Sequence, residues 1–132
     1  MGYRSYVKGG FVFKTKEQRD VFYAAAVMAV RDSCDTYILA NDLKKFTCGE
    51  LFGYHFAYDY VKWYGSWAEF FPILNDLAID NGGAWCLVRV GEDRDDIEHE
   101  YGEHDDFLDS GVYDMFQPVT VIESEWNMVD ED

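Results

Sequence analysis

Hydrophobic and polar residues alternate along several stretches of this chain and follow a helical period in two others. Residues 3–13 alternate and are rich in Tyr, Val and Phe, which predicts a strand with a bulge or kink at Gly9-Gly10. Residues 51–63 predict a longer strand, and a short strand at 36–40 also fits the pattern. The longer strand places five aromatic side chains on one face, as is typical of packing against a helix: Phe52, Tyr54, Phe56, Tyr58 and Tyr60.

Two helices are predicted between the strands, over residues 16–31 and 66–79. Each helix begins at a capping box, at 15–18 and at 66–69, in which each of two side chains can bond the backbone amide of the other residue. A glycine pair within 81–83 supplies the left-handed stop of the second helix. The apolar spacing predicts the buried stripes, which are Val21, Ala24, Ala25, Met28 and Ala29 in the first helix, with Phe22 beside them, and Phe70, Ile73, Leu74 and Leu77 in the second.

Residues 84–101 predict a β-hairpin with an acidic loop between its strands. Pairing Val90 with Ile97 sets the register, because a slip of one residue would bury the acidic side chains of the second strand. In this register Arg89 faces Glu98, which predicts a cross-strand ion pair.

The order of these elements predicts an α+β fold. After the hairpin come a long acidic connection and a final strand at 118–126, so the order is strand, helix, optional strand, strand, helix, strand, strand, strand. We expect an antiparallel or mixed sheet of four to five strands with two helices packed on one face. With 132 residues the chain forms one domain, over 1–126, followed by a frayed acidic tail at 127–132.

All of the surplus negative charge lies in the last third of the chain. Residues 1–91 carry ten acidic and ten basic side chains, whereas residues 92–132 carry sixteen acidic ones and a single base, Arg94. The second segment therefore accounts for the whole net charge of −15. Crowded like charges destabilise a compact state, so the asymmetry indicates a cationic partner outside the fold.

The remaining composition narrows the class of protein. A hydrophobic content of 48% with 18% aromatic residues argues against intrinsic disorder. We expect neither a signal peptide nor a membrane span, and the acidic balance argues against direct binding to nucleic acid or an anionic membrane. The three cysteines form no CxxC pair and predict buried, reduced thiols in a cytoplasmic protein: Cys34, Cys48 and Cys86.

The acidic stretch 92–109 admits four interpretations. It could be a solvated surface, a surface that competes with nucleic acid for a basic protein, a divalent-cation site, or part of an enzyme. Calcium favours six to eight oxygen ligands, but the EF-hand spacing is absent, and His99 and His104 match no metal motif. The His99 side chain should lie on the apolar face of the hairpin with its hydrogen bonds satisfied.

We favour the competing surface and expect neither enzymatic activity nor a cofactor. Alternate residues on a strand lie about 6.8 Å apart, and phosphates of a duplex strand advance about 3.4 Å per step. Acidic residues on one strand face therefore project charge on a scale that resembles phosphates. The predicted partner-binding residues are Glu92, Asp93, Asp95, Asp96, Glu98, Glu100, Glu103, Asp105, Asp106 and Asp109, with Trp63 and Tyr64 as an apolar anchor.

Three short motifs resemble a family of small bacteriophage proteins. They are Met1-Gly-Tyr-Arg-Ser5, Val61-Lys-Trp-Tyr64, and Val88-Arg-Val-Gly-Glu-Asp93 followed by Asp95-Asp96-Ile97-Glu98. This chain departs from that family in its acidic connection at 102–117 and in Ser66-Trp67. The resemblance brings no catalytic residues. It implies a phage accessory protein that acts in the cytoplasm of the host, of the kind that inhibits restriction, CRISPR or similar defence machinery.

The prediction is thus an inhibitor that binds a basic, nucleic-acid-handling host protein through residues 92–109. Two alternatives stay open: a divalent-cation-binding module, and a structural or assembly protein whose acidic surface only confers solubility.

Overall fold

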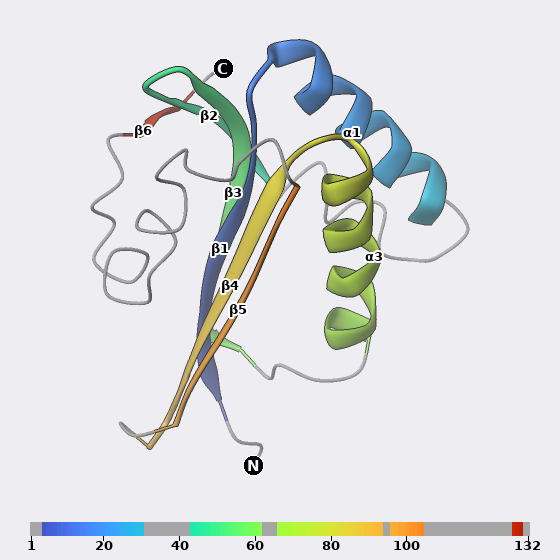
Figure 1. The fold of residues 1–132 in the computed structure, drawn as a ribbon. Helices are drawn as coiled ribbons and strands as arrows, with labels where there is room; N and C mark the ends of the chain where they lie inside the picture. Colours follow the sequence, from blue (N-terminus) through green and yellow to red (C-terminus); the bar gives the residue numbers. More distant parts are fainter. Residues whose placement is uncertain (1–3, 31–42, 62–65, 94–95, 105–127, 131–132) are drawn as a thin grey trace.

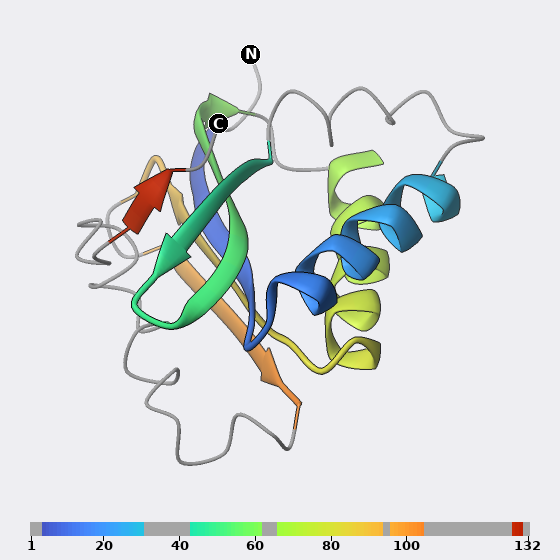
Figure 2. The same ribbon diagram turned by 90° about the horizontal axis from the view of Figure 1, so that it is seen from above.

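The computed structural model describes residues 4–30, 43–61, 66–93, 96–104 and 128–130. In these ranges a six-stranded antiparallel sheet carries two helices on one of its faces (Figure 1, Figure 2). The elements in chain order are β1 (Ser5–Phe13), α1 (Lys16–Val30), β2 (Lys44–Cys48), β3 (Leu51–Val61), α3 (Ser66–Asp80), β4 (Ala84–Gly91), β5 (Ile97–Glu103) and β6 (Met128–Asp130).

The sheet confirms the predicted α+β class and its antiparallel pairing. Its spatial order is β5-β4-β1-β3-β2-β6, so β1 lies between β3 and β4 and the hairpin strand β5 is outermost. The sheet has one strand more than the four to five expected, because the three-residue β6 pairs with β2.

The C-terminal residues form a short strand that the sequence does not predict. Residues 127–132 were expected to fray, but Met128–Asp130 pairs in register with Phe46–Cys48. The backbone of β2 provides hydrogen-bonding partners that the tail sequence alone does not reveal. The strands predicted at 36–40 and 118–126 lie outside the described residues.

The bulge in β1 lies nearer the start of the strand than predicted. The register between β1 and β3 shifts between Ser5 and Val7, and the pairing is regular at Gly9-Gly10. Gly9 serves another purpose: a Cβ there would lie 2.2 Å from the Cys86 carbonyl oxygen and 3.0 Å from the Phe56 ring. A glycine at this position lets β1 approach β4 beneath an aromatic ring.

The main core lies between the sheet and the helices. The predicted aromatic ladder of β3 contributes to it, with Tyr54 and Phe56 buried and Tyr58 packed against them. The Phe56 ring lies 4.6 Å from that of Phe71 on α3, measured between centroids. Other buried members come from β1, β4 and both helices, together with Leu43 just before β2: Val7, Phe11, Phe13, Phe22, Ala26, Leu43, Leu74, Ala78 and Leu87.

The predicted buried stripe is wrong for α1 and partly confirmed for α3, where Leu74 is buried and Leu77 packs against the core. On α1 the residues that face the sheet are Arg19, Phe22 and Ala26, whereas Val21 and Met28 are 55% and 59% exposed. The run of alanines gives a weak hydrophobic signal. In addition the buried face includes Arg19, which is fully buried, lies 3.5 Å from the Asp20 carboxylate and stacks over two aromatic rings of β3.

On α3 the buried face is rotated by about one residue relative to the prediction. Phe71, Leu74 and Ala78 are buried, Leu77 is half-buried and Ile73 is exposed. Two adjacent phenylalanines at 70 and 71 make the helix apolar around much of its circumference, so the period alone does not select the stripe.

The predicted helix ends are confirmed where the structure describes them. Gln18 donates its backbone N–H to the Thr15 hydroxyl at 3.1 Å, and Thr15 donates its own N–H to the Gln18 side chain at 3.2 Å. At the end of α3, Gly82 has a φ of +80°, and Gly83 donates to the Ala78 carbonyl oxygen at 2.8 Å. This is the Schellman arrangement expected of a glycine stop. The side chains of the box at 66–69 lie outside the described set.

Neither described helix has the length and apolar character needed to cross a lipid bilayer.

Candidate functional site

The β4–β5 hairpin, which carries the described part of the acidic stretch, has the predicted register. Val90 pairs with Ile97, Arg89 with Glu98 and Leu87 with Glu100. The alternation separates two kinds of side chain, as expected. Glu98 and Glu100 share the face that carries the helices, and both are exposed because β5 is at the edge of the sheet (Figure 1).

Arg89 is the centre of a charged cluster near the turn of this hairpin. It is buried and donates to Glu98 Oε1 at 2.8 Å and to both carboxylate oxygens of Asp96, at 2.8 and 3.1 Å. Its Nη1 also donates to the Ser5 hydroxyl at 3.0 Å, which ties β1 to the hairpin. The hydrogen bonds to Glu98 and Asp96 raise the pKa of Arg89 above its already high ordinary value, so the guanidinium stays charged.

The two carboxylates of this cluster differ in their access to solvent. The Asp96 side chain is 34% exposed and accepts two hydrogen bonds from the guanidinium, whereas the Glu98 side chain is 60% exposed and accepts one. The predicted Arg89–Glu98 pair is therefore confirmed, and Asp96 is an additional partner that the alternation does not reveal. Asp96 serves mainly the fold, and Glu98 still presents charge at the surface.

The turn of the hairpin adds two exposed carboxylates. Glu92 accepts a hydrogen bond from the backbone N–H of Arg4 at 2.9 Å, which fixes its side chain beside the start of β1. The backbone of Asp93 accepts from the Asp96 N–H at 2.9 Å and closes the turn. Both side chains remain exposed, so the turn is negative at its surface.

The far end of β5 is less exposed. Glu103 is half-buried and accepts a hydrogen bond from the Tyr101 hydroxyl. Among the described residues, four of the predicted acidic side chains thus present charge to solvent: Glu92, Asp93, Glu98 and Glu100. We call these four the acidic edge.

The other predicted site residues lie outside the described part of the chain. They are Asp95, Asp105, Asp106, Asp109, Trp63 and Tyr64. The sequence reasoning in turn missed Ser5 and the backbone of Arg4, which hold the hairpin to β1 from more than eighty positions away. Only the three-dimensional pairing of β1 with β4 brings them to the site, and no local pattern signals it.

His99 departs from the expectation of a satisfied core histidine. It is half-buried opposite Val88, and its Nε2 is shielded from solvent and has no hydrogen-bond partner within the described residues. The placement on the apolar face is correct, but the predicted hydrogen bonding of this nitrogen is not.

The opposite face of the sheet carries a second buried cluster, which includes the predicted reduced thiol of Cys86. Val12, Phe46, Ala84 and Val88 are its other fully buried members. Burial raises the pKa of the Cys86 thiol well above its ordinary value, and a hydrogen bond to the Gly10 backbone offsets part of that rise. The thiol is free, buried and un-ionised at neutral pH.

This raised pKa predicts a loss of stability at high pH. An unfolded chain ionises its thiols above about pH 8.5, whereas folded Cys86 stays neutral, so its contribution is complete below that pH and declines above it by about 1.4 kcal/mol per unit. Urea unfolding of the wild type and of Cys86→Ala should therefore show a stability difference that changes between about pH 8 and pH 10. Parallel pH profiles for the two proteins would contradict this prediction.

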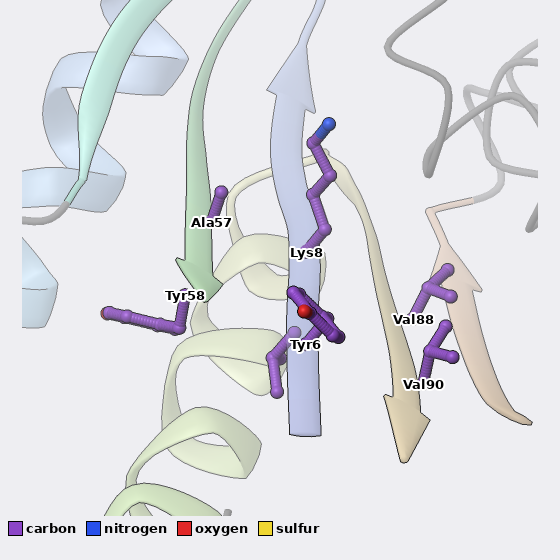
Figure 3. A pocket seen from close by; sticks show the side chains of 7 residues that line it. Tyr6, Lys8, Ala57, Tyr58, Val88 and Val90 are labelled. Atoms are coloured by element: carbon purple, nitrogen blue, oxygen red, sulfur yellow. The ribbon is translucent and has the colours of Figure 1, made fainter. Parts of the chain in front are cut away.

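A hollow of about 370 Å³ lies on the same face of the sheet as the second cluster (Figure 3). Tyr6 and Lys8 stand beside it, and small or branched side chains of β3 and β4 form its floor; the lining is Tyr6, Val7, Lys8, Ala57, Tyr58, Val88 and Val90. Lys8 is the one charged side chain of this lining. The hollow faces away from Glu98 and Glu100 and is thus distinct from the acidic edge.

Within the described ranges, no group of three or more His, Cys, Asp or Glu residues is arranged to hold a metal ion.

No protein-family model, curated protein or solved structure matches this chain. The resemblance to small bacteriophage proteins therefore stays a prediction based on its three motifs.

Proposed function

We propose that this chain is a non-enzymatic binding protein whose acidic edge engages a basic, nucleic-acid-handling protein. The observation that carries the proposal is the exposure of Glu98 and Glu100 on one face of the outermost strand, with Glu92 and Asp93 at the adjoining turn. These side chains belong to the segment that holds the entire net charge of −15. A field of one sign attracts an oppositely charged partner and speeds its association.

The spacing of these charges supports a partner that normally binds nucleic acid. Glu98 and Glu100 are two residues apart on a strand, a separation of about 6.8 Å, which is close to two phosphate steps of about 3.4 Å. A groove built for phosphates offers lysine and arginine at intervals that such a strand can engage. Because the binding replaces counterions on both surfaces, it should weaken steeply as salt rises.

The energetics of the hairpin also favour a role outside the fold. The single positive charge of Arg89 offsets only one of the two negative charges on Asp96 and Glu98, and the exposed Glu100 pairs across the strands with the apolar Leu87. A surface selected for stability alone would intersperse charges of both signs around these residues. The acidic edge is thus better explained by an external cationic surface than by folding.

The biological setting follows from the motifs that resemble phage proteins. We propose that the protein acts in the cytoplasm of a bacterial host and inhibits a restriction, CRISPR or similar defence protein by occupying its nucleic-acid site. This proposal is based on the resemblance of three motifs to phage proteins and on the negative charge of residues 92–132. It specifies the class of target, a nucleic-acid-binding defence protein.

The test is capture from a bacterial lysate at low salt, followed by elution with duplex DNA. The wild type should retain a basic protein that duplex DNA releases, because both ligands compete for one site. Glu98→Gln/Glu100→Gln should fold normally and lose that protein, since Asp96 continues to hold Arg89 through two hydrogen bonds.

The matched control is Glu17→Gln/Glu50→Gln, which removes the same charge from exposed positions on α1 and the β2–β3 turn. It should retain the partner as the wild type does. Recovery of the same protein in equal amount by the Glu98/Glu100 variant would remove the acidic edge from the proposal.

A further inference from the structure

The outer side of β5 carries backbone groups that point away from the sheet. Gly91 donates its N–H to the Asp96 carbonyl oxygen at 2.8 Å, and His104 donates to the Gly83 carbonyl oxygen at 2.8 Å. Both pairs belong to the same antiparallel register, in which hydrogen-bonded and non-hydrogen-bonded pairs alternate. The residues of β5 that bond β4 are therefore Glu98 and Glu100, and the N–H and C=O groups of Ile97 and His99 face outward.

No described strand lies beyond β5, as Figure 1 and Figure 2 show. The side chains around the outward groups are accessible, since Ile97 is 49% exposed and Glu98 and Glu100 are exposed. Such an edge is a template for a further strand. Its two faces differ in chemistry, with carboxylates on the helix side and the apolar Ile97 on the other.

We propose that the edge of β5 from Ile97 to Glu100 receives an extended segment of the partner as an additional antiparallel strand. The segment carries lysine at alternate positions, opposite Glu98 and Glu100, and apolar residues between them, opposite Ile97 and His99. This inference rests on the proposed function and specifies how the basic partner binds. Charge complementarity selects the lysine-bearing face, and the outward backbone groups supply the hydrogen bonds.

The antiparallel geometry fixes which groups of the segment are used. Residues opposite Ile97 and His99 form hydrogen-bonded pairs, so the apolar residues of the segment direct their N–H groups toward β5. The lysines lie in non-hydrogen-bonded pairs with Glu98 and Glu100, where side chains are closest. The lysine N–H groups point away from β5.

The direct test uses the acetylated and amidated peptide Lys-Val-Lys-Val-Lys-Val-Lys and two N-methylated forms of it, titrated into the wild-type protein at low salt. Methylation of the valine nitrogens removes donors that face β5 and should weaken binding by at least about tenfold. Methylation of two lysine backbone nitrogens alters only donors that point away from β5, and it should leave the affinity within about twofold. A valine-methylated peptide that binds as tightly as the parent would overturn the proposal.

A second test changes the protein. His99→Pro removes one outward N–H and keeps the bonds of Glu98 and Glu100 to β4, and proline is tolerated on an edge strand. His99→Ala is its control, because it removes the same imidazole and keeps the N–H. His99→Pro should bind the parent peptide several-fold more weakly than His99→Ala, and equal affinities of the two folded variants would contradict strand addition. If His99→Pro does not fold, the methylated peptides still decide.

The failure of this inference can be told apart from the failure of the proposed function. Glu98→Gln/Glu100→Gln reports on charge, whereas the methylated peptides and His99→Pro report on the backbone. Loss of peptide binding only in the charge variant would leave the acidic edge as the contact surface and overturn strand addition. Unchanged binding in the charge variant would overturn the proposed function itself.

Discussion

Replacing Gly9 with alanine should remove much of the protein's stability. The added Cβ would lie 2.2 Å from the Cys86 carbonyl oxygen and 3.0 Å from the Phe56 ring. The first obstacle is backbone of the neighbouring strand, which cannot rotate away as a side chain can. Overpacking usually costs about 1–3 kcal/mol, and a clash between two central strands belongs at or above the top of that range. Urea unfolding followed by circular dichroism measures the change.

The control for Gly9→Ala is Gly49→Asn, which tests the effect of a positive φ at a glycine where an added Cβ meets no other atom. Gly49 has a φ of +62° and open space around its Cβ position, so the substitution meets only the modest cost of asparagine in the left-handed region. We expect a loss below about 1 kcal/mol. Equal stabilities of Gly9→Ala and Gly49→Asn would show that β1 and β4 are not held as closely as the structure has them.

Replacing Arg89 with methionine should produce the second large loss. The change preserves much of the side-chain volume but leaves Asp96 and Glu98 without their guanidinium and Ser5 without its donor. Removing one partner of a buried ion pair costs about 3–5 kcal/mol. The low end applies, since both carboxylates are partly exposed and water can solvate them. Thermal and urea unfolding should both report it.

The companion variant is Arg89→Met/Asp96→Asn/Glu98→Gln, which removes the charges together. It should recover part of the stability lost in Arg89→Met, because no uncompensated carboxylate remains. A triple variant less stable than Arg89→Met, or an Arg89→Met protein as stable as the wild type, would show that the cluster does not act through charge compensation.

The sequence predicts those parts of the fold that depend on local chemistry. The hairpin register followed from the penalty for burying acidic residues, and the capping box and glycine stop followed from side chains a few residues apart. All three are confirmed.

The helix faces could not be predicted in the same way. On α1 the alanines bury little area whichever way they face, and the buried Arg19 contradicts the usual binary pattern. On α3 the apolar residues cover too much of the circumference to define one stripe. Tertiary packing decides between faces that the pattern leaves nearly equal.

The candidate site also has a part that the sequence predicts and a part that depends on contacts between distant segments. The exposure of Glu98 and Glu100 and the Arg89–Glu98 pair depend on the register, which the residue types determine. The contributions of Ser5 and Arg4 depend on β1 lying beside β4, a contact between distant segments that no pattern in the sequence signals.

The most direct measurement of the central claim is the affinity of the captured partner for three purified proteins, determined by calorimetry at about 50 and 200 mM salt. The three are the wild type, Glu98→Gln/Glu100→Gln and the equally charged Glu17→Gln/Glu50→Gln. The acidic edge predicts that the first and third bind alike and lose affinity steeply with salt, while the second binds far more weakly at both concentrations. Equal affinities for the two variants would contradict it, because net charge and not the position of Glu98 and Glu100 would then govern binding.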